Sequence, residues 1–282
     1  MRQPMNVAIV GAGDKTEVII STLQLNTPFL LIDDGPIIDA LTIPLLESVT
    51  TPSRPRVLYF DHKHHSFNPL TGIDYLKARE FIEIVDAIFP QGENTLTRKN
   101  SNAVILSALL KRPRNLRTLI RRGRDPASLD AHQKIETLML SPVLSRVLSN
   151  PINFSLRATV LARLDRAELG DFDAFVLASL LIGQYPGQIV IPDFGFYGRD
   201  LHTSLIRQGR LVAGVNFLSE VPRKMRDALL TARNKIVFRT NPSDAETLLP
   251  YFHTSMFMGS ERRSITKPQQ IMELADGEYL VV

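Results

Sequence analysis

Short apolar runs alternate with segments of helical spacing along most of this 282-residue chain, and this alternation constrains its fold more than any other feature. The runs are continuous, rich in branched residues, and followed by turn residues such as Gly11 and Asp33. Continuous runs of this kind are typical of parallel strands buried on both faces. We therefore predict an α/β fold in which helices cover a parallel sheet. The expected strands are residues 7–10, 29–32, 56–60, 159–164, 188–191, 212–218, 235–239 and 279–282.

The middle of the chain breaks this alternation. Apolar residues recur there at helical spacing, and no strand pattern interrupts them. The helical patterns cover residues 75–89, 103–110 and 135–148. We interpret residues 74–149 as a helical insertion or subdomain, and residues 1–73 and 150–282 as the α/β core.

The composition excludes several classes of protein. Cysteine is absent, so disulfides and thiolate metal sites are excluded. No apolar run is long enough to span a membrane, and the residues after Met1 lack the apolar stretch of a signal peptide. We therefore expect no membrane span and a cytoplasmic location. The net charge is only +4, so a nucleic-acid partner has to be inferred from where the positive charge lies.

The turn after the first expected strand, Gly11-Ala-Gly-Asp-Lys-Thr16, contains parts of a phosphate-binding loop. Such a loop needs glycines whose N–H groups surround phosphates, a lysine for the terminal phosphates, and a Ser/Thr hydroxyl for Mg²⁺. This turn is two residues shorter than the full pattern, and Asp14 replaces the glycine before the lysine. Two interpretations remain open. One is a weak or absent ATP and Mg²⁺ site formed by Gly11, Gly13, Lys15 and Thr16, and the other is a tight turn with a solvated lysine.

The same segment supports a rival interpretation. A strand, a Gly-x-Gly turn and an acid about twenty residues later are typical of the start of a Rossmann-type dinucleotide-binding unit. Thr16 stands where the third glycine of that fingerprint belongs. This alternative predicts that Asp33 or Asp34 contacts an adenine ribose.

The second candidate is Ile191-Pro-Asp193-Phe, at the end of an expected strand. A Walker B strand ends in one acid that holds Mg²⁺ and a second that orients the attacking water. Asp193 can fill the second role, but Pro192 cannot fill the first. A strand that ends in a proline turn explains these residues equally well.

A basic segment follows the second helical pattern, and it contains no acid. Its cations could neutralise phosphates along a DNA duplex. Its apolar residues would form one face of a helix, so the other interpretation is a basic amphipathic helix on the surface. The cations are Lys111, Arg112, Arg114, Arg117, Arg121, Arg122 and Arg124.

The histidine-rich segment Asp61-His-Lys-His-His65 contains suitable metal ligands. It follows a strand, where a turn would send alternate side chains in different directions. We therefore favour a solvated loop and predict no metal site.

With these residues in place, the chain resembles the HerA/FtsK superfamily of P-loop ATPases, and within it the TraG-like conjugative coupling proteins. The resemblance lies in several segments that span nearly the whole chain in the family's order. They are the strand and turn ending in Ser66-Phe-Asn-Pro-Leu70, the strand at 161–170, the Gly-Arg helix end and sensor strand at 205–219, and the blocks at 232–239, 244–246 and 271–279.

The resemblance implies a RecA-like P-loop NTPase fold, ATP and Mg²⁺ as cofactors, and a hexameric ring that pumps DNA. Only four functional positions carry over: Lys15, Thr16, Asp193 and Arg210, the last near a neighbouring subunit's nucleotide. The magnesium acid is Pro192, and the sensor glutamine falls at about Ser219.

We therefore predict a degenerate DNA-translocase-type ATPase with weak or no hydrolysis, in which Asp193 and Arg210 are the catalytic candidates. It would act in DNA transfer or packaging, as a homo-oligomer or as the partner of an active ATPase. An active ATPase with a variant loop and the dinucleotide-binding protein are the alternatives.

Overall fold

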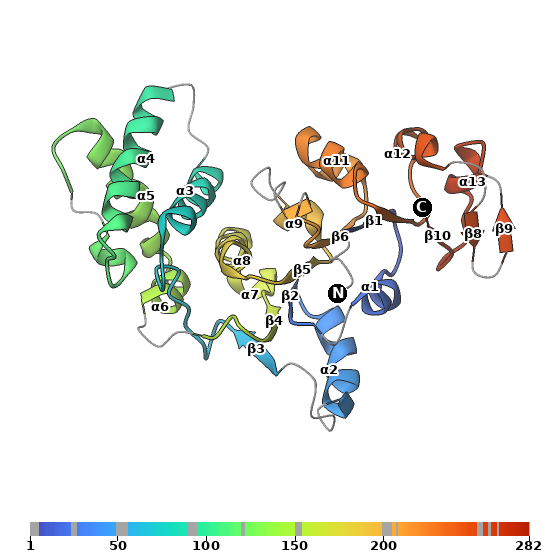
Figure 1. The fold of residues 1–282 in the computed structure, drawn as a ribbon, viewed down its shortest axis with the longest axis horizontal. Helices are drawn as coiled ribbons and strands as arrows, with labels where there is room; N and C mark the ends of the chain where they lie inside the picture. Colours follow the sequence, from blue (N-terminus) through green and yellow to red (C-terminus); the bar gives the residue numbers. More distant parts are fainter. Residues whose placement is uncertain are drawn as a thin grey trace. The chain divides into compact units, whose positions relative to one another are not determined.

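The structure is a computed structural model, and it describes residues 6–23, 27–48, 56–89, 95–119, 122–149, 154–198, 205–206, 208–252, 256–258, 261–263 and 265–281 (Figure 1). The chain forms two compact units. The first consists of residues 1–56 and 187–282, and the second of residues 57–186. Each unit is described by itself.

The strands of the first unit form a largely parallel sheet. Neighbouring strands run parallel except β10, which pairs antiparallel with β7. Their order across the sheet is β10 (Leu280–Val281), β7 (Asn234–Val237), β1 (Val7–Val10), β6 (Leu211–Val215), β5 (Gln188–Ile191) and β2 (Phe29–Asp33).

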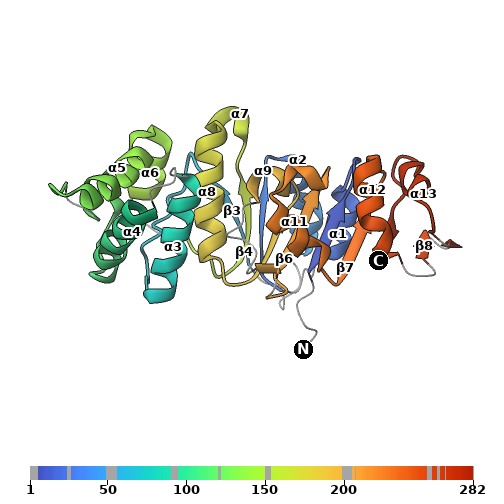
Figure 2. The same cartoon turned by 90° about the horizontal axis from the view of Figure 1, so that it is seen from above.

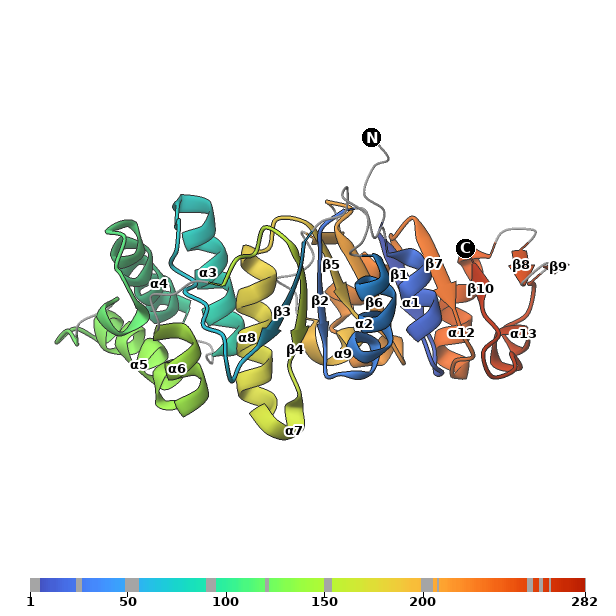
Figure 3. The same cartoon turned by 90° about the horizontal axis from the view of Figure 1, so that it is seen from below.

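Helices lie on both faces of this sheet. Figures 2 and 3 show α1 (Thr16–Thr22) and α2 (Pro36–Ser48) against one face and α11 (Arg223–Leu230) against the other. Strands β1, β2 and β6 are buried along their whole length, as continuous apolar runs in a sheet covered on both faces should be. The unit also contains α9 (Phe194–Tyr197), η3 (Leu218–Glu220), α12 (Pro242–Leu248), η4 (Leu249–Tyr251), α13 (Gln269–Met272), and the antiparallel pair β8 (Met256–Met258) and β9 (Glu261–Arg263).

The carboxyl ends of the parallel strands in this unit meet at one edge of its sheet. The connections that begin there are residues 11–15 after β1, 34–35 after β2, 192–193 after β5, 216–217 after β6 and 238–241 after β7. In open α/β sheets, ligands bind outside the carboxyl ends of the strands. Any site built by this unit is therefore expected at this edge.

In the second unit, helices form most of the connection between two parallel strands. β3 (Val57–Asp61) pairs with β4 (Thr159–Arg163), so that Asp61 lies beside Arg163. Among the residues that the structure describes between β3 and β4, there is no strand, and all the regular elements are helices. In order, they are α3 (Tyr75–Ile88), α4 (Thr95–Leu110), η1 (Leu116–Thr118), α5 (Pro126–Leu140) and α6 (Pro142–Ser149), and α7 (Arg166–Leu169) and α8 (Asp171–Gln184) follow β4.

A buried charged cluster joins the helices of this connection. Lys134 on α5 is 3% exposed, and its Nζ lies 3.2 Å from an Asp130 carboxylate oxygen and 3.5 Å from Asp86 Oδ1 on α3. The other oxygen of Asp86 accepts hydrogen bonds from Arg98 and Asn102 on α4. A buried lysine needs such partners because an unpaired buried charge is strongly destabilising.

The predicted α/β fold with a mostly parallel sheet is confirmed. Each expected strand is present, with ends shifted by up to three residues. Helices α11, α12 and α13 and the β8–β9 pair were not predicted. The predicted helical insertion, 74–149, holds α3 to α6, but the second compact unit also includes β3, β4, α7 and α8, and the domain limits stay a prediction. Over the described residues, no helix combines the length and apolarity needed to cross a bilayer.

Candidate nucleotide site

The loop after β1 is clamped between the ends of two neighbouring strands. The Gly11 N–H donates to the Val215 carbonyl at 3.1 Å, and the Ala12 N–H donates to the Arg239 carbonyl at 2.8 Å. Gly11 has φ 117°, and a Cβ there would lie 2.6 Å from the Phe238 carbonyl oxygen. Only glycine fits such a position. Two loop amides are thus occupied by the protein's own carbonyls.

Asp14 turns its carboxylate back onto the start of α1. Its Oδ1 accepts the Thr16 backbone N–H at 2.9 Å. Hydrogen bonds from the Thr16 hydroxyl and then from the Thr16 amide hold the pKa of Asp14 below its ordinary value. The acid that departs from the P-loop pattern is therefore bonded to the threonine that carries over from it.

Lys15 is buried where the carboxyl ends of the parallel strands meet. Its side chain is buried, and Nζ donates to Asn216 Oδ1 at 2.7 Å. Burial lowers the pKa of Lys15, although the charges of Glu220, Asp193 and Asp14 oppose this shift. The interpretation of this segment as a tight turn with a solvated lysine is wrong in its second part, because Lys15 is only 8% exposed.

The connection after β6 also contributes to this edge of the sheet. Glu220 Oε2 accepts the Asn216 backbone N–H at 3.0 Å. A Cβ on Gly195 would lie 2.7 Å from the same Glu220 oxygen, so the carboxylate packs against the start of α9. Three carboxylates, those of Asp14, Asp193 and Glu220, act electrostatically on one lysine.

The residues after β5 have local structural roles. Asp193 Oδ1 accepts the Phe196 backbone N–H at 3.2 Å and caps α9. A Cβ on Gly214 of β6 would lie 2.3 Å from the Pro192 carbonyl oxygen. β6 and the proline turn therefore pack closely, and this contact accounts for the glycine in β6.

Arg210 lies at the opposite edge of this sheet, because it immediately precedes β6 whereas Asp193 follows β5, and the two strands are parallel. Gly209, with φ 71°, ends the helical turn before it, which agrees with the expected Gly-Arg helix end. Arg210 Nε donates to the Gly187 carbonyl and Nη1 donates to Gln208, each at 2.9 Å. Within one chain, Lys15, Thr16 and Asp193 are therefore gathered at one edge without Arg210.

The acid required by the dinucleotide alternative is engaged elsewhere. Asp33 Oδ2 accepts the N–H groups of Gly35, Ile37 and Ile38 at 3.1, 2.8 and 3.2 Å, so it caps α2. Burial raises the pKa of Asp33, against the effect of these amides. Asp34 is exposed. The arrangement disfavours a ribose contact at Asp33.

No protein-family model matches the chain, and no curated protein matches it significantly. Solved structures do. The bacterial conjugative coupling protein TrwB superposes with a TM-score of 0.61 at 11% identity, over 98% of this chain and 82% of that chain. The chain has the coupling-protein fold. Another structure of TrwB, with ADP and Mg²⁺, gives a TM-score of 0.58 at 12% identity, over 98% and 82% of the two chains. VirB4 of Thermoanaerobacter pseudethanolicus gives 0.57 at 12% identity, over 98% and 86%. The predicted RecA-like P-loop fold is confirmed.

In this coupling-protein fold, the basic segment runs between α4 and α5. The interpretation of this segment as a basic amphipathic surface helix is wrong, because only η1 is helical in its described residues. The cations Lys111, Arg112, Arg114, Arg117, Arg122 and Arg124 are exposed, and Arg117 donates to Ser145 Oγ at 2.5 Å. Arg121 lies outside the described residues.

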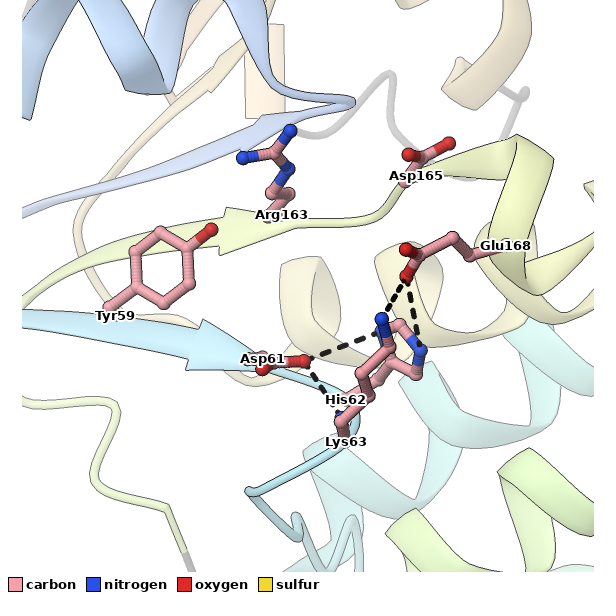
Figure 4. A pocket seen from close by; sticks show the side chains of 7 residues that line it. All are labelled: Tyr59, Asp61, His62, Lys63, Arg163, Asp165 and Glu168. Carbon is pink, nitrogen blue, oxygen red and sulfur yellow. Dashed lines mark hydrogen bonds and ion pairs between the residues drawn. The ribbon is translucent and has the colours of Figure 1, made fainter.

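The histidine-rich segment borders a polar pocket of about 250 Å³ at the carboxyl ends of β3 and β4 (Figure 4). Lys63 pairs with Glu168 at 2.7 Å, and Asp61 contacts the exposed His64 at 2.6 Å. His62 is buried, and burial lowers its pKa. Among the described residues, no group of three or more His, Asp or Glu side chains is arranged to hold a metal ion.

Proposed function

We propose that this chain is a degenerate translocase-type ATPase domain that binds ATP weakly or not at all and works in DNA transfer beside an active ATPase. The observation that carries the proposal is the carboxylate of Asp14 on the amide and hydroxyl of Thr16. In a working loop, the hydroxyl at this position serves Mg²⁺ and the nearby amides surround phosphate. Here both groups of Thr16 already have an internal anionic partner.

The charge at this edge supports the same conclusion. Lys15 supplies one positive charge, whereas Asp14, Asp193 and Glu220 supply three negative charges around it. A nucleoside triphosphate would enter a region of net negative charge, and these carboxylates would repel its phosphates. The buried lysine is also already bonded to Asn216.

The residues after β5 do not fit a Mg²⁺ ion. Pro192 has no ligand atom in its side chain, and the Asp193 carboxylate caps α9. Since neither the loop nor this strand end fits ATP and Mg²⁺, we derive no catalytic step through them. We assign Asp193 a capping role, and we keep for Arg210 the role of contacting a neighbouring subunit.

An active ATPase is the second candidate, because TrwB has been solved with ADP and Mg²⁺ and with a non-hydrolysable GTP analogue. Lys15 and Thr16 also lie at the edge where such a ligand would bind. This candidate requires Asp14 to leave Thr16 when nucleotide enters. The proposal retains the cytoplasmic location expected from the sequence, which fractionation of the host cell would test.

A phosphate-release assay tests the proposal. We expect turnover far below the usual enzyme range of about 1 per second, with and without DNA. Turnover in that range, abolished by Lys15→Ala, would establish the active ATPase instead. The matched control is Lys224→Ala, which removes a lysine from the exposed surface of α11 and leaves Lys15 and its neighbours unchanged.

A further inference from the structure

The second half of helix α4 is uncharged on its outer face as well as on the face that its own subdomain covers. Ser101, Ile105 and Leu109 are buried, on the side where α4 packs against α3 and α5 (Figure 1). The residues from 101 to 110 carry no charge at all. A surface helix normally presents charged or polar residues on its outer face, so the uncharged outer face of α4 requires an explanation.

A groove runs along this outer face. It has a volume of about 600 Å³, and Lys111 and Thr118 complete its lining. Leu110, next to it, is 50% exposed. An exposed apolar surface that is hollowed in this way is typical of a protein-interaction site. We call it the α4 groove, and its floor is formed by Ala103, Val104, Ser107, Ala108, Pro113 and Leu119.

Basic side chains lie along the rim of the α4 groove. From Thr95 to Arg124 the sequence has nine Lys and Arg residues and no acid. Lys111 lines the groove, and Arg112 and Arg114 are exposed beside it. Arg112 has φ 54°, the only positive φ of a non-glycine residue among those described. The partner that matches an uncharged floor with this rim has an apolar stripe flanked by acidic side chains.

We propose that the α4 groove docks an acidic amphipathic helix of a partner protein. The small side chains on the floor let a helix approach closely, its apolar stripe fills the groove, and its carboxylates face the basic rim. DNA, predicted for the same cations from the sequence, would use the rim but would leave the apolar floor uncovered. The proposal does not depend on the state of the nucleotide site.

Fluorescence anisotropy with a labelled synthetic peptide tests this proposal. The peptide has about 18 residues, or five helical turns, with leucines on one face and glutamates on the other. We expect saturable binding to the full chain. Ser107→Glu, in the exposed floor, should weaken binding at least about tenfold, and so should Lys111→Glu in the rim. Lys224→Glu on α11 is the matched control and should change nothing.

Two further probes separate the outcomes. A peptide of the same composition, with leucines distributed around the helix, should bind at least about tenfold more weakly. Equal binding of the two peptides, or no effect of Ser107→Glu, would overturn the docking proposal. A DNA duplex of about 20 base pairs that binds tightly, with loss on Lys111→Glu but not on Ser107→Glu, would assign the surface to nucleic acid. Circular dichroism establishes that each variant is folded; Lys111→Ala replaces Lys111→Glu, and Ser107→Gln replaces Ser107→Glu, where the first variant is not.

Discussion

Asp14 is the residue at which this loop departs from the phosphate-binding pattern, because it replaces the glycine before the lysine. An aspartate at this place could be read from the sequence, and so could its unsuitability beside phosphate. Its conformation could not, because either a solvent-facing or an inward carboxylate satisfies the same sequence. The structure bonds it to Thr16 at 2.9 Å. The substitution therefore does more than remove a glycine, since it supplies an internal anion.

The bond from Asp14 should be measurable as stability. Because the folded protein lowers the pKa of Asp14 from 3.8, its contribution is fully present well above pH 3.8 and is lost as the pH falls through the folded value. Asp14→Ala should therefore lower the free energy of unfolding at pH 7 by roughly 0.5 kcal/mol, because solvent screens this exposed carboxylate. Urea titrations at several pH values measure this, and the difference should shrink toward pH 3. Asp14→Asn keeps an acceptor oxygen but not the charge and is the control; no loss in Asp14→Ala, or a loss that does not change with pH, would refute the carboxylate's role.

At the scale of elements, the sequence located the buried strands well because each is a continuous apolar run. It missed α11, α12 and α13, which are short, and whose stability comes from tertiary packing rather than from their own periodicity. It also could not show why Gly11, in the loop after β1, and Gly214, in β6, have to be glycines. Gly11 is required by the Phe238 carbonyl, and Gly214 by the Pro192 carbonyl. Both contacts join segments that are distant in sequence.

The contact between β6 and the proline turn leads to a second test. Gly214→Ala would place a Cβ 2.3 Å from a backbone carbonyl oxygen, which cannot move as a flexible side chain could. Overpacking of this kind should destabilise the fold by about 2 kcal/mol, measured as a lower urea midpoint. Ser219→Ala, at an exposed position, should leave the midpoint unchanged. A Gly214→Ala protein as stable as the wild type would contradict the close packing.

On the scale of the whole molecule, the coupling-protein fold is retained over 98% of the chain at 11% identity to TrwB. The buried pattern that specifies a parallel sheet is compatible with very different sequences, whereas a nucleotide site depends on a few particular atoms. A bound nucleotide stabilises whichever state binds it. If the chain binds no nucleotide, as we propose, it should assemble, if it assembles at all, independently of nucleotide.

Light scattering measures this independence. The monomer has a mass of 31.6 kDa, and the mass measured at micromolar protein should be the same with and without ATP and Mg²⁺. If a ring forms, Arg210→Ala should weaken it, because an arginine pairs bidentately with a neighbour's carboxylate or phosphate. Nucleotide-driven assembly into a ring would show that the site still works.

The most direct test of the central claim is a calorimetric titration of the wild-type protein with ATP and Mg²⁺. We expect no saturable heat up to about 1 mM ligand, a concentration that corresponds to a binding free energy of about −4 kcal/mol. Titration with NADH should be equally silent, given that Asp33 is engaged with α2. Saturable ATP binding in the micromolar range, lost in Lys15→Ala, would contradict the account.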